Sequence, residues 1–243
     1  MFTLLKKEIQ TFLYSIVGYI TIVVFLILLG LFLWIIPNDS NILDNGFATL
    51  EPMFIISPWV FLFLIPAITM RSFAEEKKTG TLELLMTRPL TDLNIVLSKY
   101  FAGVFLVFIS LLPTLTYYYT IHQLGNPQGN IDTGGMWGSY IGLMFLASSF
   151  VAIGVFTSSL VNDQITSFIA GIFMCFICYA GFGYLSGLPI LGKFDSAIQS
   201  LGISEHYNAM ARGVIDSRDL LYFLGINTVF IISTKTVLES RKW

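Results

Sequence analysis

Six long apolar stretches constrain this chain more than any other feature of its sequence. A helix that spans the hydrocarbon core of a bilayer needs about 20 predominantly apolar residues. Stretches of this kind lie at approximately 12–36, 53–73, 99–121, 137–158, 165–185 and 220–238. They leave no room for a separate soluble catalytic domain. We therefore predict an all-α integral membrane protein in which residues 1–243 form one domain of six transmembrane helices.

The composition supports the same class of protein. Only 12% of the residues are charged and 55% are hydrophobic, whereas soluble domains carry about 25% charged residues. The net charge of −2 argues against nucleic acid as a partner, because surfaces that bind phosphates usually have an excess of basic residues.

The first apolar stretch follows Lys6, Lys7 and Glu8, as the hydrophobic part of a signal peptide would. It is longer than the roughly 7–15 apolar residues of a signal peptide, and no cleavage site of small residues follows it. We therefore expect an uncleaved first span.

Basic residues predict the orientation. Six spans place both termini on one side of the membrane. If that side is the cytoplasm, every Lys and Arg except Lys193, Arg212 and Arg218 lies on the cytoplasmic side, as the positive-inside rule requires. We expect a multi-pass protein with both termini in the cytoplasm.

The densest run of charge, RSFAEEKKTGTLELLMTRPL at 71–90, then lies on the cytoplasmic side, between the second and third spans. We name residues 71–99 the elbow. Ser72 and Glu75 have the spacing of a capping box, which marks the start of a helix. Either Thr91 or Asp92 could begin the next helix.

Within the elbow, Gly80 and Pro89 enclose a short segment that carries an apolar stripe of Leu82, Leu85 and Met86 at helical spacing. Two interpretations remain open for this amphipathic helix. It could rest on lipid, with Lys77 and Lys78 near anionic headgroups, or it could be a docking helix for a cytoplasmic protein. The acidic residues of the elbow slightly favour a protein partner, because an anionic leaflet would repel them.

No catalytic, cofactor or metal site is expected. Residues 187–194, GLPILGKF, resemble a phosphate-binding loop, but Phe194 occupies the place of the required Ser or Thr. Cys175 and Cys178 have a C-x-x-C spacing inside an apolar run, which indicates packing. No Asp, Glu, His or Arg lies in the middle of a span, so an ion-coupled transporter lacks a candidate carrier.

The second long segment between spans, residues 186–219, is expected on the outer side, as short helices at the interface. Ser204, Glu205 and His206 suggest a hydrolase triad, but residues adjacent on a helix do not face one another. Asp216 and Asp219 could cap the last span.

The elbow sequence from Arg71 through Gly80-Thr81-Leu82-Glu83, Pro89 and Lys99 resembles the signature of ABC-2 type transporter permeases. The stretches SEHYNAMARGVIDSRDLLYF (204–223) and TRPLTD (87–92) look closest to the GldF-type permeases associated with gliding motility. The resemblance implies an ABC-2 exporter fold in the cell inner membrane, with the elbow as an amphipathic coupling helix that contacts an ATPase.

The resemblance also implies partners. The ATPase would be a GldA-like subunit that binds ATP and Mg²⁺, and the second membrane subunit would be GldG-like or a second copy of this chain. The chain itself would not be an enzyme. The elbow residues implied in coupling are Arg71, Phe73, Glu75, Gly80, Thr81, Leu82, Glu83, Leu85, Met86 and Pro89. Those implied before the last span are Glu205, His206, Arg212, Gly213, Asp216, Arg218 and Asp219.

Two alternatives stand beside a permease. A membrane scaffold could anchor motility or secretion machinery without transporting anything. An intramembrane hydrolase would instead depend on Ser204 and His206. A catalytically inactive partner ATPase would leave the scaffold's function intact, whereas a permease would lose its function.

Overall fold

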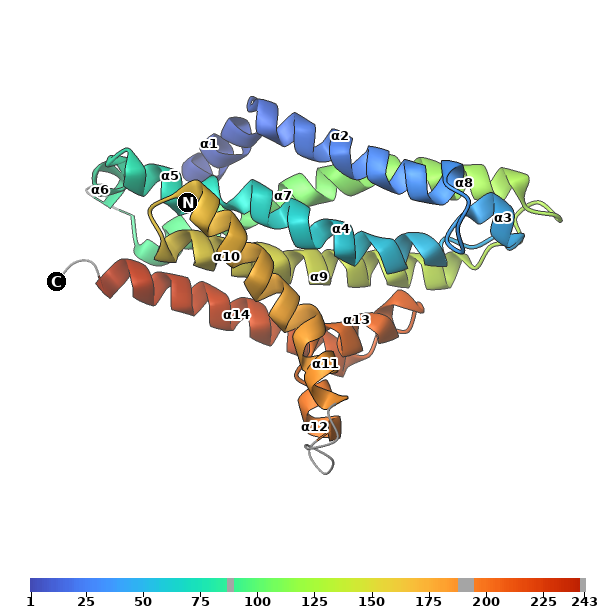
Figure 1. Ribbon diagram of the computed structural model, residues 1–243. Helices are drawn as coiled ribbons and strands as arrows, with labels where there is room; N and C mark the ends of the chain where they lie inside the picture. The colour runs from blue at the N-terminus through green and yellow to red at the C-terminus, as the bar shows by residue number, and fades with distance from the viewer. Residues whose placement is uncertain (87–89, 188–194, 241–243) are drawn as a thin grey trace.

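The computed structural model describes residues 1–86, 90–187 and 195–240, and in this part of the chain it contains helices and no strand. Within these described ranges, six helical segments are long and apolar enough to cross a membrane. These segments are Ile16–Ile35, Glu51–Lys78, Asp92–Leu124, Thr133–Leu160, Gln164–Ser186 and Ser217–Glu239. They overlap the six stretches expected from the sequence, so the predicted fold class is confirmed (Figure 1).

The helices before the central one are α1 (Phe2–Leu13), α2 (Ile16–Gly30), η1 (Leu31–Ile35), α3 (Ile42–Asn45), α4 (Glu51–Thr69), α5 (Arg71–Lys78), α6 (Thr81–Met86), α7 (Asp92–Leu111), η2 (Leu112–Thr114) and α8 (Leu115–Leu124). They are followed by α9 (Thr133–Leu160), α10 (Gln164–Phe176), η3 (Ile177–Gly181), α11 (Phe182–Ser186), α12 (Asp195–Gln199), α13 (Ile203–Ala211) and α14 (Ser217–Glu239).

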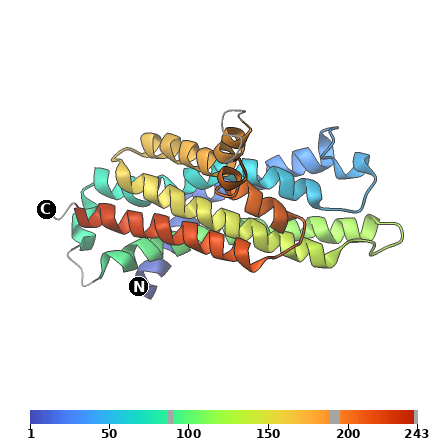
Figure 2. The ribbon, with the colours of Figure 1, turned by 90° about the horizontal axis from the view of Figure 1, so that it is seen from below.

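Helix α9 is the centre of the bundle and packs against α4, α5, α7, α10, α13 and α14. Figure 2 shows it running along the middle of the molecule, with α14 beside it. Its small residues let neighbouring backbones approach closely, which is how helices associate when no water is available to be displaced. A Cβ at Gly154 would collide with Thr69 of α4, and one at Gly142 would lie 2.6 Å from Met210 Cβ of α13.

The two ends of the bundle hold different elements. The elbow end carries α1, α5, α6 and the last turn of α14, and the opposite end carries α3 and the first turn of α9 (Figure 1). The first helix, α1, and the end of the last span, α14, thus both lie at the elbow end, as an even number of spans requires.

Polar side chains begin several helices. Asp132 accepts a hydrogen bond from Gly135 N at the start of α9, and Asp163 accepts from Ile165 N at the start of α10. Thr91 caps α7 by accepting a hydrogen bond from Asn94 N. Of the two caps that the sequence allowed, Thr91 and Asp92, the structure therefore uses Thr91. Asp216 caps α14, which leaves Asp219 in the first turn for another contact.

The predicted first span, 12–36, was wrong at its beginning. Helix α1 ends at Leu13, and a separate helix starts after Ser15, whose hydroxyl accepts a hydrogen bond from Val17 N. The apolar run alone could not reveal this break, because the side chains on both sides of Ser15 are apolar. Helix α1 packs against α7 and buries Leu4 and Glu8, while Lys6 and Lys7 stay exposed.

Helices α2, α10 and α14 expose much of their apolar surface. Helix α10 leaves the bundle obliquely, so that α11 and α12 stand away from it (Figure 1). Apolar faces of this kind fit a protein whose surface is covered by lipid.

Candidate functional site

The junction of α4 and α5, where the elbow begins, is held by a side chain of α9. Ser158 Oγ accepts hydrogen bonds from Phe73 N at 3.0 Å and Ala74 N at 3.1 Å, and it donates to Met70 O at 3.0 Å. The hydroxyl thus bonds backbone N–H and C=O groups that would otherwise hydrogen-bond to one another within a continuous helix. An inserted side chain of this kind is a recognised cause of helix kinks.

The predicted capping box was therefore wrong. Ser72 is buried inside the helix, and the start of α5 has no side-chain cap of its own. The chain continues almost directly from α4 into α5, and α9 supplies the oxygen that a local cap would have provided.

Two lysines at the end of α5 bind the turn between α9 and α10. Lys77 Nζ donates to the carbonyl oxygens of Ser159 and Val161, at the C-terminal end of α9. Cations are stabilised there by the free carbonyls and the helix dipole. Lys78 Nζ lies 3.4 Å from Asp163 Oδ1.

The Asp163 carboxylate is also stabilised by the start of α10. The backbone N–H of Thr166, and then the side chain of Lys78, keep the pKa of Asp163 below its ordinary value. The carboxylate therefore stays charged at neutral pH and remains available to Lys78.

Helix α6 differs from the predicted docking helix. Gly80 turns the chain into it with a φ of +70°, a conformation that favours glycine. Leu82 is only 5% exposed and belongs to the core of this chain, and Leu85 is half-buried against that core. The apolar stripe predicted on α6 is thus covered, at Leu82, mostly by this chain itself.

The predicted elbow residues divide into three groups. Phe73 and Leu82 are buried, and Arg71 and Leu85 are half-buried. Exposed at the elbow are Glu75, Gly80, Thr81 and Glu83. The side chain of Met86 and all of Pro89 lie outside the described residues.

A groove of about 610 Å³ opens beside α6 at the elbow end. Its lining residues are Lys77, Lys78, Gly80, Leu82, Glu83, Asn162 and Asp163. The groove thus lies between two loops that are distant in sequence, and it presents both signs of charge.

A cluster of buried and half-buried charges, which the sequence reasoning missed, joins α5 to α7 and α1. Lys99 Nζ of α7 lies 2.7 Å from Glu76 Oε1 of α5 and 3.4 Å from Glu8 Oε1 of α1. It also lies 5.1 Å from the centre of the Phe73 ring. The Lys99 side chain is 2% exposed. Glu8 and Lys99 each lie within a largely apolar helix, α1 and α7, but their pairing depends on the placement of α1.

At the opposite end, the described part of 186–219 brings several predicted residues together. His206 Nδ1 lies 2.6 Å from Asp219 Oδ1, and His206 Nε2 lies 2.9 Å from the carbonyl oxygen of Ser200. Glu205 Oε2 accepts a hydrogen bond from Gln199 Nε2 at 2.9 Å. Both ring nitrogens of His206 are therefore engaged away from Ser204, which argues against a hydrolase triad.

The other predicted residues of this segment shape its backbone. Gly213 has a φ of +81° and lies against the backbone of Gly135 and Gly138. Asp216 accepts a hydrogen bond from Arg218 N, and this bond is the main reason that the pKa of Asp216 is lowered.

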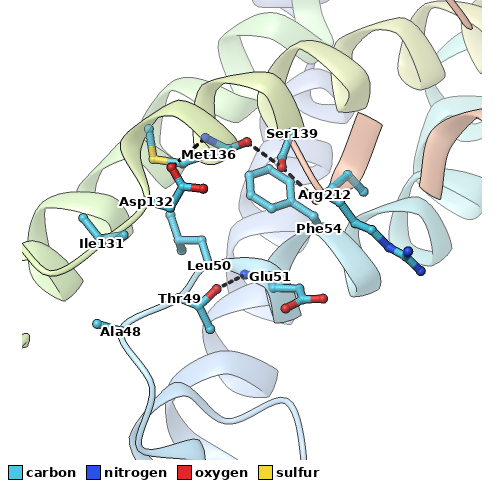
Figure 3. Close-up of a pocket in the computed structure, with 12 residues that line it drawn as sticks. Ala48, Thr49, Leu50, Glu51, Phe54, Ile131, Asp132, Met136, Ser139 and Arg212 are labelled. Carbon is cyan, nitrogen blue, oxygen red and sulfur yellow. Dashed lines mark hydrogen bonds between the residues drawn. The ribbon is translucent and has the colours of Figure 1, made fainter. Parts of the chain in front are cut away.

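A cavity of about 250 Å³ lies beside Arg212, between the starts of α4 and α9 and the end of α13 (Figure 3). Thr49, Asp132 and Ser139 line it, and each bonds a nearby backbone group of the chain. The guanidinium of Arg212 points away from Asp132 (Figure 3). Hydrogen bonds within the protein thus already engage these three side chains.

The fold and the elbow together define a multi-pass membrane protein of the permease class. A family model described as ABC-2 family transporter protein matches residues 37–202, which is more than half of the chain. The chain therefore belongs to this family, and it is a membrane subunit of an ABC transporter. The match includes the elbow and the groove beside it. No curated protein matches the chain.

Proposed function

We propose that this chain couples ATP hydrolysis by a separate ATPase subunit to substrate export, or to the transmission of force, across the inner membrane. The observation that carries the proposal is the attachment of the elbow. Ser158 and Lys77 bond it to α9, the helix that contacts most of the bundle. A force that the ATPase applies to the elbow would thus be transmitted through α9 to the core of the protein.

The docking surface is formed by exposed polar groups rather than by the buried Leu82. Thr81 and Glu83 of α6 stand beside the groove, and Lys78 and Asp163 supply further charges along it. This surface carries both positive and negative side chains, which favours a protein partner. An anionic lipid surface would instead repel the carboxylates.

In this proposal the elbow end faces the cytoplasm, with both termini, and 186–219 faces outward. The excess of basic residues at that end supports this orientation. The resemblance of 87–92 and 204–223 to GldF supports a role in gliding motility. The partners would then be a GldA-like ATPase, which binds ATP and Mg²⁺, and a GldG-like membrane subunit or a second copy of this chain.

Copurification tests the docking surface. The affinity-tagged chain is coexpressed with the candidate ATPase. The membranes are then solubilised in detergent, and the tagged chain is purified from them. We expect Glu83→Lys to reduce recovery of the ATPase at least tenfold. The matched control is Glu51→Lys, the same charge reversal at an exposed site at the opposite end, which should retain the ATPase. Full recovery with Glu83→Lys would refute docking at this surface.

A second experiment separates a permease from a scaffold. Cells whose partner ATPase has lost its catalytic residue should lose the function that this chain supports. Wild-type motility in such cells, with the complex still assembled, would favour the scaffold.

A further inference from the structure

A groove of about 340 Å³ opens between α3 and the end of α8, at the end of the bundle opposite the elbow. Its walls are mainly apolar, and three of their side chains are largely uncovered: Leu43 is 61% exposed, Phe47 72% and Leu124 62%. Figure 1 shows both elements at the far end of the bundle, beyond the start of α14. Large apolar side chains that gather around one groove mark an interaction site when water surrounds them.

The aromatic residues of this end indicate the depth of the groove. Trp34 of η1 and Tyr117 of α8 meet edge to face, with their ring centroids 6.0 Å apart. Amphipathic rings of this kind lie at the level of the lipid headgroups. Helix α8 then rises about 10 Å from Tyr117 to Leu124, whereas the headgroup region of one leaflet is roughly 5–8 Å thick. The groove therefore lies past the headgroups, whichever side of the membrane this end faces.

The lengths of the helices lead to the same position. The helical segment Asp92–Leu124 has 33 residues, which corresponds to roughly 50 Å. A bilayer with its headgroups is only about 40–45 Å thick, and the last span, Ser217–Glu239, has 23 residues. In Figure 1 the excess length over α14 lies at the end that carries the groove. This end thus projects into water.

The charge around the groove is negative. The described residues that line it include no Lys or Arg, and Asp39 and Asp44 are exposed in and just before α3. The segments 36–51 and 115–135, which form this end, contain four acidic residues and neither Lys nor Arg. The negative end of the α8 dipole adds to their field. Arg212 lines a separate cavity, on the side of α13.

We propose that this groove docks a protein on its side of the membrane, through a segment that carries apolar side chains flanked by Lys or Arg. The apolar side chains fill the space between Phe47 and Leu124, and the basic residues meet the acidic surface around it. Lipid fits less well, because the groove lies past the headgroups and an anionic leaflet repels its carboxylates. A second copy of this chain in a symmetric dimer would place the same acidic surface against itself.

Binding of model peptides to the full chain in nanodiscs of zwitterionic lipid tests this chemistry. The probes are two fluorescent peptides with the same centre, Leu-Phe-Leu, flanked on each side by two lysines or by two glutamates. We expect saturable binding of the lysine peptide, at least tenfold weaker binding of the glutamate peptide, and a several-fold loss of affinity at high salt. Empty nanodiscs give the blank. Failure of the lysine peptide to bind, or equal binding of the two peptides, would overturn the proposal.

Substitutions in the chain locate the bound peptide. Phe47→Ala should weaken binding of the lysine peptide at least fivefold, and Asp44→Lys should weaken it further. The matched control is Val214→Ala, because Val214 is 62% exposed at the same end and does not line the groove. It should bind as the wild type does. Unchanged affinity in Phe47→Ala, or an equal loss in Val214→Ala, would place the peptide elsewhere and count against the groove.

The accessibility of a spin label distinguishes a protein-docking groove from one that is filled by lipid. In a background without Cys175 and Cys178, labels are attached through Phe47→Cys and through two references. Asn162→Cys lies in the exposed turn after α9, and Val229→Cys is 60% exposed in the middle of α14. The label at 47 should resemble the one at 162, with more collisions with a water-soluble nickel chelate than with oxygen. Resemblance to 229 would place the groove in lipid and refute the proposal. Neither experiment needs the ATPase or the orientation, so failure of the proposed function would not affect them.

Discussion

Lys99 Nζ on α7 lies 2.7 Å from Glu76 Oε1 on α5, and the lysine side chain is almost fully buried. With Glu8 on α1 at 3.4 Å, this pair connects the N-terminal helix, the elbow and the third span. A buried pair of this kind adds little stability compared with a well-packed apolar pair, but removing one partner leaves the other charge without compensation.

Replacing Lys99 with Met should therefore be costly. Glu76 would lose its cation and Glu8 would keep only Lys7, whose Nζ lies 4.0 Å away. The expected loss is about 3–5 kcal/mol of unfolding free energy. Thermal melting of the purified protein measures it. Glu8→Gln in the Lys99→Met chain should recover part of the loss, because one buried charge disappears. A Lys99→Met protein as stable as the wild type would contradict the role of the cluster.

Ser158→Ala should destabilise the start of the elbow. The N–H groups of Phe73 and Ala74 would lose their acceptor in a buried site, at a cost of about 1–3 kcal/mol. Ser149 on the same helix offers a close comparison, because its buried hydroxyl has no hydrogen-bond partner among the described residues. Ser149→Ala should change stability by less than about 1 kcal/mol. Equal effects in chemical denaturation would argue against the bridging role of Ser158.

Gly154→Ala should separate α4 from α9. The added methyl group would overlap Thr69, whose hydroxyl already bonds Ile65 O at 2.9 Å. Overpacking at such a contact costs about 1–3 kcal/mol. Gly225 of α14 has nothing within 4 Å of an added Cβ, so Gly225→Ala should leave Tm unchanged or raise it slightly. Wild-type stability of Gly154→Ala would show that the two helices can shift apart freely.

Gly80→Ala should strain the turn between α5 and α6. A non-glycine residue in a left-handed conformation costs about 1–2 kcal/mol, and an added Cβ at Gly80 meets no atom within 4 Å. The effect should therefore come from the backbone alone, and Gly80→Asn should be milder because Asn tolerates this conformation. Limited proteolysis of the elbow measures the effect. We expect Gly80→Ala to be cleaved fastest, Gly80→Asn more slowly and the wild-type chain slowest. The same susceptibility for all three would exclude strain at this turn.

The six spans could be predicted because apolar length is a local property of the sequence. The elbow was likewise visible as a charged segment between breakers, and the start of α7 was placed at Thr91 or Asp92 from the local sequence alone. The burial of Leu82 could not be foreseen, since an apolar stripe does not reveal whether its own chain or a partner covers it. The oxygen that caps α5 comes from Ser158, more than 80 residues away. Glu8 was hidden as a partner of Lys99 because the break at Ser15, which sets α1 apart from α2, was missed.

Helix α9 runs without interruption from Gly138, which touches the backbone of Gly213, to Ser158, which holds the elbow. Twenty residues of α-helix make a rigid rod of roughly 30 Å. If such a rod pivots by only about 5° at one end, its other end travels on the order of 2–3 Å. Gly138 and Gly213 have no side chains that could bend to absorb this displacement. The loop at Gly213 must therefore travel with the rod or separate from it.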